Sequence, residues 1–340
     1  MTLTPLARLV APGELASHDA PSKWPALVAE TIAAHAPDAS VIVRDGEALR
    51  ARCSLWWNDV PPFGTERLGV IGHYAALADD SGRAVLTAAV DELGRRGCTF
   101  AVGPMDGNTW RSYRLVVEQG TEPPFFLEPT NPESWPHHFT AAGFTPLAHY
   151  YSSLNTDLGR RDERSGATAA RLGELGVTIR AVDLARFDEE LHGIYSVAAV
   201  AFRDAFLYTP LSEAEFAAQY QRIRPLVRSE LVLIAERDGQ TIGFSFNIPD
   251  VLEAKRATPE RTAIIKTLAI LPDRSYAGLG SLLVDRSHEA MASLGFERAI
   301  HALMHESNRS RGISARGAEP MRRYALFGRA LTTDVNTVGP

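Results

Sequence analysis

Residues able to do proton-transfer chemistry cluster near the C-terminus, in the stretch HALMHESN at residues 301–308. His305 and Glu306 follow an apolar run that predicts a strand, and α/β proteins usually place their sites at the C-terminal ends of strands. An imidazole can accept a proton directly near neutral pH, whereas a carboxylate can act through a water molecule. Because adjacent strand residues point to opposite faces, we expect only one of the two to face a cleft. The commoner alternative is a solvated strand edge or a helix cap.

An anion-binding turn is the second candidate, within IIKTLAILPDRSYAGLGSLLVDRSHEAMASL at residues 264–294. Its apolar start, ended by Pro272, predicts a strand, and leucines at helical spacing after Gly280 predict an amphipathic helix. Between them, main-chain N–H groups without an intrahelical partner would lie at the positive end of the helix dipole. A pyrophosphate fits such a cradle, because glycine at positions 278 and 280 keeps side chains away from the N–H groups.

The residues expected to form this cradle are consecutive. They are Ser275, Tyr276, Ala277, Gly278, Leu279, Gly280 and Ser281. One alternative is that the two glycines only shape a turn, and another is a Rossmann fingerprint. The fingerprint is disfavoured because it needs a third glycine where Leu283 stands.

This strand, turn and helix resemble the acyl-CoA-binding motif of the GNAT acyltransferase superfamily, whose turn reads Arg/Gln-x-x-Gly-x-Gly/Ala. The chain has Ser275 at the first position, with Arg274 one residue earlier, which removes one side-chain contact but leaves the main-chain cradle. The resemblance implies that acetyl-CoA, or another acyl-CoA, is the co-substrate. It also implies that a main-chain N–H in the strand before the cradle, within Leu268, Ala269 and Ile270, binds the acyl carbonyl.

The resemblance also bears on the polar residues near the C-terminus. GNAT proteins often place an asparagine after the next strand to bond the pantetheine arm, and Asn308 resembles it, with a helix N-cap as the alternative. They also often supply a tyrosine as general acid, but the equivalent stretch here, RSRGISARGA, contains none. Tyr324, on the last predicted strand, is the substitute candidate, with packing as the alternative. The candidate catalytic set is therefore His305, Glu306 and Tyr324.

The order of strands and helices occurs twice along the chain, which predicts an internal duplication. In each half, a hairpin with Asp-Gly at its turn precedes an apolar strand, a long helix and another strand. The predicted fold is α/β (α+β), with two tandem GNAT-like domains, each a mixed, mostly antiparallel sheet flanked by helices. We place the domains at residues 1–155 and 177–340, joined by a charged linker at residues 156–176. The alternative is that the linker is a surface loop of one large domain.

The first half is expected to be a degenerate copy. Its corresponding turn carries Asp79 and Asp80 where the second half has its two glycines, and two carboxylates oppose phosphate binding. An aromatic and proline-rich stretch at residues 103–139 predicts a long structured loop, which either packs the halves together or lines an acceptor pocket. We therefore expect the second half to hold the acyl-CoA.

Composition restricts the remaining classes of function. The chain has 340 residues, 45% of them hydrophobic, and its formal net charge of −6 gives no electrostatic reason to bind nucleic acid or a membrane surface. No stretch has the length of a membrane span. Cys53 and Cys98 are too few for a disulfide framework or a thiolate metal site, which suits a cytoplasmic protein. Direct acyl transfer requires no metal, so we expect none, and a homodimer is left open.

The leading functional hypothesis is an N-acyltransferase. It would move an acetyl or longer acyl group from CoA to a primary amine of a small molecule or peptide by direct attack. One alternative is an acyltransferase that takes its donor from an acyl-carrier protein or an aminoacyl-tRNA. The other is a protein that binds CoA without turnover.

Overall fold

The computed structural model describes residues 6–307 and 317–331. The strands of the first half are β1 (Ala7–Val10), β2 (Ala39–Asp45), β3 (Ala48–Trp56), β4 (Leu68–Ala76), β5 (Phe100–Gly103), β6 (Leu115–Glu118) and β7 (Thr145–Asn155). Its helices are α1 (Ala29–His35), α2 (Asp79–Arg95) and α3 (Ser134–Ala141), with the 3-10 helix η1 (Pro12–Ser17).

The second half begins with a helix that precedes its strands. Its strands are β8 (Thr178–Ala181), β9 (Val232–Arg237), β10 (Gln240–Pro249), β11 (Thr262–Ile270), β12 (Arg298–His305) and β13 (Ala318–Ala330). The α-helices are α4 (Ser165–Glu174), α5 (Phe187–Ala201), α6 (Glu213–Ile223), α7 (Val251–Lys255) and α8 (Leu279–Ser293). The 3-10 helices are η2 (Leu184–Arg186), η3 (Arg224–Leu226), η4 (Ser229–Leu231) and η5 (Arg274–Tyr276).

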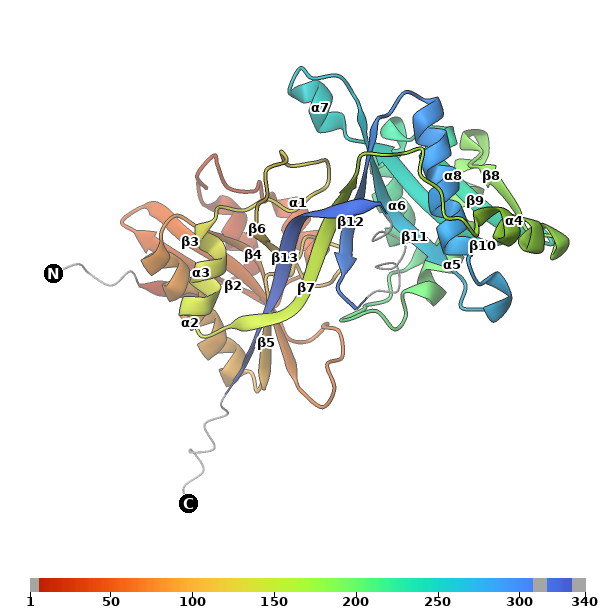
Figure 1. The fold of residues 1–340 in the computed structure, drawn as a ribbon. Helices are drawn as coiled ribbons and strands as arrows, with labels where there is room; N and C mark the ends of the chain where they lie inside the picture. The colour runs from red at the N-terminus through yellow and green to blue at the C-terminus, as the bar shows by residue number, and fades with distance from the viewer. Residues whose placement is uncertain (1–5, 308–316, 332–340) are drawn as a thin grey trace.

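The described strands form one mixed sheet that crosses the whole molecule (Figure 1). Their order is β1-β2-β3-β4-β5-β13-β7-β12-β11-β10-β9-β8, and β6 attaches to β13. Within each half the same unit recurs: an antiparallel hairpin, then a strand that pairs in parallel across a long helix. The parallel pairs are β4 with β5 across α2, and β11 with β12 across α8. The predicted repetition of one unit is therefore confirmed.

The two halves exchange strands at the centre of the sheet. β13, the last described strand of the chain, lies between β5 and β7 and pairs antiparallel with both. β7, from the first half, pairs antiparallel with β12 of the second half. In Figure 1 the dark blue β13 accordingly lies beside the yellow-green β7 and the orange β5. Each half of the sheet is thus completed by a strand from the other half of the chain.

Both predicted hairpins form for a local reason. Gly46 lies in the turn between β2 and β3 with φ of +57°, and Asp238 and Gly239 join β9 to β10 with φ of +52° and +75°. Positive φ angles in a two-residue turn match the twist of the flanking strands, and Asp-Gly tolerates them. Asp238-Gly239 therefore forms the second turn as predicted, whereas the first turn is Gly46-Glu47, because Asp45 ends β2 opposite Ala48.

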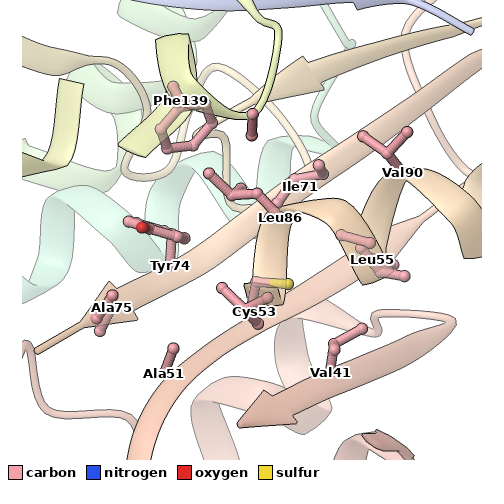
Figure 2. Close-up of a cluster of buried hydrophobic side chains, with 14 of the residues drawn as sticks. Val41, Ala51, Cys53, Leu55, Ile71, Tyr74, Ala75, Leu86, Val90 and Phe139 are labelled. Carbon is pink, nitrogen blue, oxygen red and sulfur yellow. The ribbon is translucent and has the colours of Figure 1, made fainter. Parts of the chain in front are cut away.

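Helices cover the sheet on the faces that the strand alternation makes apolar. In the first half, α2 packs on β2, β3 and β4, and Figure 2 shows Leu86 and Val90 of α2 together with Cys53 and Ile71 of the sheet. In the second half, Ile234 faces the cluster that contains α5 and α6, whereas the adjacent Leu233 faces the cluster that contains α8. Adjacent strand residues point to opposite faces, so α5 and α8 lie on opposite sides of the sheet.

The segment between the two predicted domains is not a bare loop. The linker expected at residues 156–176 contains helix α4, which packs against α8. The predicted packing role of the aromatic loop is supported by Trp110, whose Nε1 donates to the main-chain oxygen of Thr209 in the second half (2.7 Å).

Candidate functional site

The parallel strands β11 and β12 pair for only part of their length. Their register runs from Thr262 opposite Arg298 to Ile265 opposite His301, and no pairing follows beyond it. The next residue, Lys266, has no partner on β10, because the register jumps from Ile265 to Thr267 there, which is a β-bulge in β11. The segments after this point, residues 266–270 and 302–305, therefore leave an unpaired edge between them.

Main-chain N–H groups of β11 face this unpaired edge. Leu271 N donates to Ile242 O of β10 (2.8 Å), and hydrogen bonding alternates along an antiparallel pair. The amide of Ala269 therefore also points to β10, whereas the amides of Leu268 and Ile270 point to the edge opposite β12. Of the three residues expected to hold an acyl carbonyl, two present their N–H groups to the gap.

The N-terminus of α8 presents a short run of free amides. Within the described residues, the N–H groups of residues 278–281 have no hydrogen-bond partner, and no side chain caps the helix. Gly278 is exposed, and its φ of +87° lies in the left-handed region that favours glycine. The amides of Tyr276 and Ala277, also expected to be free, instead close the 3-10 turn η5. The open part of the cradle is therefore residues 278–281.

Helix α4 supplies a positive charge beside this turn. Arg171 Nη1 donates to Ser275 O (2.8 Å), and Arg171 Nη2 donates to Ala277 O. Thr168 of the same helix lies so close that a Cβ on Gly278 would stand 2.8 Å from its Cγ2. Arg171 thus brings a guanidinium to the turn in which Ser275 replaces the Arg or Gln of the GNAT motif. Sequence reasoning missed this residue, because it lies more than 100 positions from the turn.

The polar face of α8 is buried rather than exposed. Asp285 and His288 are 8% and 4% exposed, because the chain after β7 crosses this face, and Asp162 N donates to Asp285 Oδ2 (3.2 Å). His288 Nε2 lies 3.1 Å from His301 Nε2 on β12. Burial lowers the pKa of His288 to about 4 and that of His301 to about 3, so both rings are neutral at pH 7. With Ser281 they line a cleft between α8 and β12.

His305 ends β12 in aromatic surroundings. Its ring meets Tyr150 of β7 edge-on, with ring centroids 4.9 Å apart, and Phe206, from the segment after α5, lies 6.0 Å away. Burial, followed by the charge of Arg114, lowers its pKa below the usual value. Its Nδ1 accepts from the main-chain N–H of Ser307 (3.1 Å), so the neutral ring carries its proton on Nε2. In this state His305 is a hydrogen-bond donor rather than a base.

The strand that carries His305 is shaped by the first half of the chain. The register between β12 and β7 jumps between His301 and Met304, and Leu303 has a φ of +58° at this bulge. Leu303 N donates to Ser152 Oγ (3.1 Å), and Leu303 O accepts from Arg114 Nη1 (3.2 Å). These contacts set the path of the last residues of β12.

The other polar candidates lie elsewhere. Glu306 forms an ion pair with Arg323 (3.2 Å). This ion pair lies outside the group of aromatic rings that surrounds His305. Tyr324 is fully buried, and its hydroxyl contacts Glu128 and Ser152, so it belongs to the packed core between the halves. Burial and then Glu128 raise its pKa far above the usual value. Asn308 lies outside the described residues.

The equivalent places in the first half are closed. At the start of α2, Asp80 Oδ1 accepts from Ser81 N (2.6 Å), so a carboxylate lies where α8 has free amides. Beside β4, a Cβ on Gly72 would lie 2.2 Å from Met105 O, and Met105 N donates to Ile71 O (2.8 Å). The first half thus has carboxylates at the start of its long helix, and Met105 covers the strand edge of β4.

No family model matches the chain, but curated proteins are similar to it. It is 27% identical to a bacterial ceramide synthase of Caulobacter vibrioides over 187 residues, which are 54% of this chain and 49% of that protein. The chain therefore aligns with about half the length of this relative. It is also 22% identical to protein YghO of Escherichia coli over 289 residues, covering 76% of this chain and 73% of that protein.

Solved structures show the fold. A GCN5-related N-acetyltransferase from Sphaerobacter thermophilus matches with a TM-score of 0.51 and 12% identity over 97% of both chains. A tandem GNAT protein from the clavulanic acid biosynthesis pathway matches with a TM-score of 0.50 and 14% identity, over 96% of this chain and 99% of that one. A glucosamine N-acetyltransferase region of a fungal multi-domain β-N-acetylglucosaminidase matches with a TM-score of 0.54 and 11% identity, over 96% of this chain and 38% of that one. The chain has a tandem GNAT fold.

Proposed function

We propose that the protein is an N-acyltransferase whose second half binds an acyl-CoA and transfers the acyl group to a primary amine. One observation carries the proposal: free amides at the N-terminus of α8 and an open edge of β11 lie on consecutive elements of a GNAT fold. Helix N-termini with unpaired amides bind phosphate groups. The pyrophosphate of CoA would lie on residues 278–281, with Arg171 beside it.

The acyl group would lie in the gap between β11 and β12. The amides of Leu268 and Ile270 would donate to the carbonyl oxygen and stabilise the negative charge that develops there as the amine attacks. His305 would donate from Nε2 to the same oxygen or to the departing sulfur. The amine attacks in its neutral form, and its proton passes to water. The carbon–sulfur bond then breaks, and the thiolate leaves as CoA.

The acceptor that fits best is an amine with an apolar chain. The aromatic rings of Tyr150 and Phe206 flank His305, so an acceptor bound beside this residue would contact apolar surface. A ceramide is an N-acylated long-chain amino alcohol, so the name of one relative describes the same kind of reaction. We therefore propose a long-chain amine or amino alcohol in preference to a small polar amine.

The experiment is a thiol-release assay with the full chain. Acetyl-CoA and a long-chain acyl-CoA are each offered with a long-chain amino alcohol, a short amino alcohol and a lysine-containing peptide. We expect release that depends on the amine and is fastest with the long-chain acceptor. Binding of acyl-CoA without release across this panel would show a binding protein. No binding of any CoA ester would contradict the proposal and leave donors held on a carrier protein or tRNA.

A further inference from the structure

Three potential metal ligands meet in the first half, away from the acyl-CoA site. They are His35 at the end of α1, His73 on β4 and Asp106 just after β5. Their ligand atoms all lie within 4.8 Å of one another, and this is the only such group of at least three His, Cys, Asp or Glu side chains in the described residues. No sequence spacing predicts the cluster, because its members lie 33 or more residues apart.

We propose that His35, His73 and Asp106 bind one transition-metal ion of the zinc class. The ligand atoms would be His35 Nδ1, His73 Nε2 and Asp106 Oδ2. In the structure, the two imidazole nitrogens are 2.8 Å apart, and His73 Nε2 lies 4.0 Å from Asp106 Oδ2. Tetrahedral ligands about 2.05 Å from zinc are about 3.3 Å from each other, so small side-chain rotations suffice.

The side chains of His73 and Asp106 are each oriented by a second contact, as metal ligands usually are. His73 Nδ1 lies 3.0 Å from Ser54 Oγ, and a proton on Nδ1 leaves the Nε2 lone pair facing His35 and Asp106. Asp106 Oδ1 accepts from His73 N (2.6 Å), which leaves Oδ2 available. The main-chain oxygen of His35 accepts from Trp56 Nε1 (2.8 Å), which fixes the end of α1.

The backbone at the cluster also differs from an ordinary strand. His73 has a φ of +48°, in the left-handed region that a non-glycine residue rarely adopts, and the register of β3 against β4 jumps at this point. Strained conformations of this kind persist where surrounding structure holds them, often at functional sites. In this conformation His73 Nε2 lies 2.8 Å from His35 Nδ1.

Two arginines lie near the cluster and affect how a metal ion would bind there. Arg111 Nη1 donates to the main-chain oxygens of His35 (3.1 Å) and Asp106 (3.2 Å), which ties together the segments that carry two of the ligands. Its charge, with that of Arg52, opposes any cation in the site. The donor atoms decide between cations: magnesium and calcium prefer oxygen ligands and are disfavoured, whereas zinc-class ions gain from two imidazole nitrogens.

The proposed metal site occupies a position that has a counterpart in the second half. β4 and β5 correspond to β11 and β12, and His73 lies on the strand bulge that corresponds to Lys266 in the second half. The first half therefore places a metal site at the counterpart of the acyl site. A bound ion would join α1, β4 and the chain after β5, and so keep the first half closed.

The experiment measures zinc binding to the full chain after treatment with a chelator. Calorimetric titration with Zn²⁺ should give one tight site per chain, and elemental analysis after dialysis should recover about one ion. We expect His73→Ala to remove the site and Asp106→Asn, whose amide oxygen can still accept from His73 N, to weaken it at least tenfold. The cobalt-loaded protein should show the visible absorption of four-coordinate Co²⁺.

The second buried histidine pair supplies the control. His288 and His301 also lie 3.1 Å apart, but no third ligand joins them in the described residues. His288→Gln should therefore leave the zinc stoichiometry unchanged. Absence of a tight site in the wild type, or full retention of it in Asp106→Asn and His73→Ala, would overturn the proposal. Acyl-CoA binding is not part of this test, so its result is independent of the proposed transferase function.

Discussion

The ring of His305 lies where residues from both halves of the chain meet. Tyr150 comes from the first half and Phe206 from the second, and Arg114 donates to Leu303 O, two residues before His305 on the strand. Because Nδ1 accepts from Ser307 N, we propose that His305 acts as a donor at Nε2. A donor and a base respond differently to substitution, so the roles can be separated.

We expect His305→Ala to lower kcat by about 10²-fold or more, because the developing negative charge loses one donor. His305→Gln, whose amide N–H can still donate, should retain more activity than His305→Ala. The measurement is steady-state thiol release, together with acyl-CoA affinity, which should not change in either variant. His149→Gln is the matched control, because His149 is exposed on the neighbouring strand. Equal loss in the alanine and glutamine variants would instead support a base.

The N-terminus of α8 and the helix α4 together form the proposed cradle. α8 offers free amides at residues 278–281, and α4 fixes the preceding turn through Arg171. The amides bind anions only if the turn keeps them exposed, so both the glycine and the arginine should affect affinity for the cofactor.

Gly278→Ala should weaken acyl-CoA binding at least tenfold. The new Cβ would meet Thr168 at 2.8 Å in a left-handed conformation, so the turn must move. Gly295→Ala is the matched control, because Gly295 ends the same helix with φ of +88° and nothing lies within 4 Å of its Cβ position. Both variants should lose about 1 kcal/mol of stability from the left-handed backbone. Calorimetry should then show lost affinity only at position 278.

Arg171→Met should also weaken acyl-CoA binding, by several-fold, because a positive charge and two hydrogen bonds to the turn are lost. Arg164→Met serves for comparison, since Arg164 begins the same helix but pairs with Asp162. The binding of dephospho-CoA and of CoA should weaken alike if Arg171 acts on the pyrophosphate cradle. An unchanged affinity for both would place Arg171 outside the site.

At the scale of the whole molecule, the exchange of β7 and β13 joins the halves into one sheet, and buried histidines link its stability to pH. His288 and His301 have folded-state pKa values of about 4 and about 3, below the 6.5 of the unfolded chain. Below pH 6.5 the unfolded state therefore binds more protons than the folded state, and stability falls.

The described helices include none long and apolar enough to cross a membrane.

We expect the urea midpoint to fall as the pH is lowered from 6.5 to 4.5, and to change little from these groups above pH 7. Each of the two histidines contributes at most about 1.4 kcal/mol per pH unit in this window. The variant His288→Gln/His301→Gln should show a shallower dependence than the wild type. Equal slopes in the two proteins would mean that the pair is not held neutral by burial.

Local elements of the fold could be predicted from the sequence, whereas contacts between residues far apart in the chain could not. The hairpin at Gly46, the strand β11 and the helix α8 follow from turn chemistry and periodicity within a few residues. The contact of Arg171 with Ser275 and the edge-on contact of Tyr150 with His305 join residues more than 100 positions apart, and no local pattern encodes them. The burial of the polar face of α8 is not encoded locally either, because a distant segment covers it.

A calorimetric titration of CoA into the wild type, Gly278→Glu and Asp80→Ala tests which half of the chain holds the acyl-CoA. We expect one CoA per chain in the wild type, because the carboxylates of Asp79 and Asp80 at the start of α2 oppose phosphate binding in the first half. Gly278→Glu should abolish binding by adding bulk and negative charge to the cradle, while cooperative unfolding shows that the variant is folded. Asp80→Ala should bind as the wild type does. Unchanged affinity in Gly278→Glu, or a marked loss in Asp80→Ala, would contradict the assignment of the acyl-CoA site to the second half.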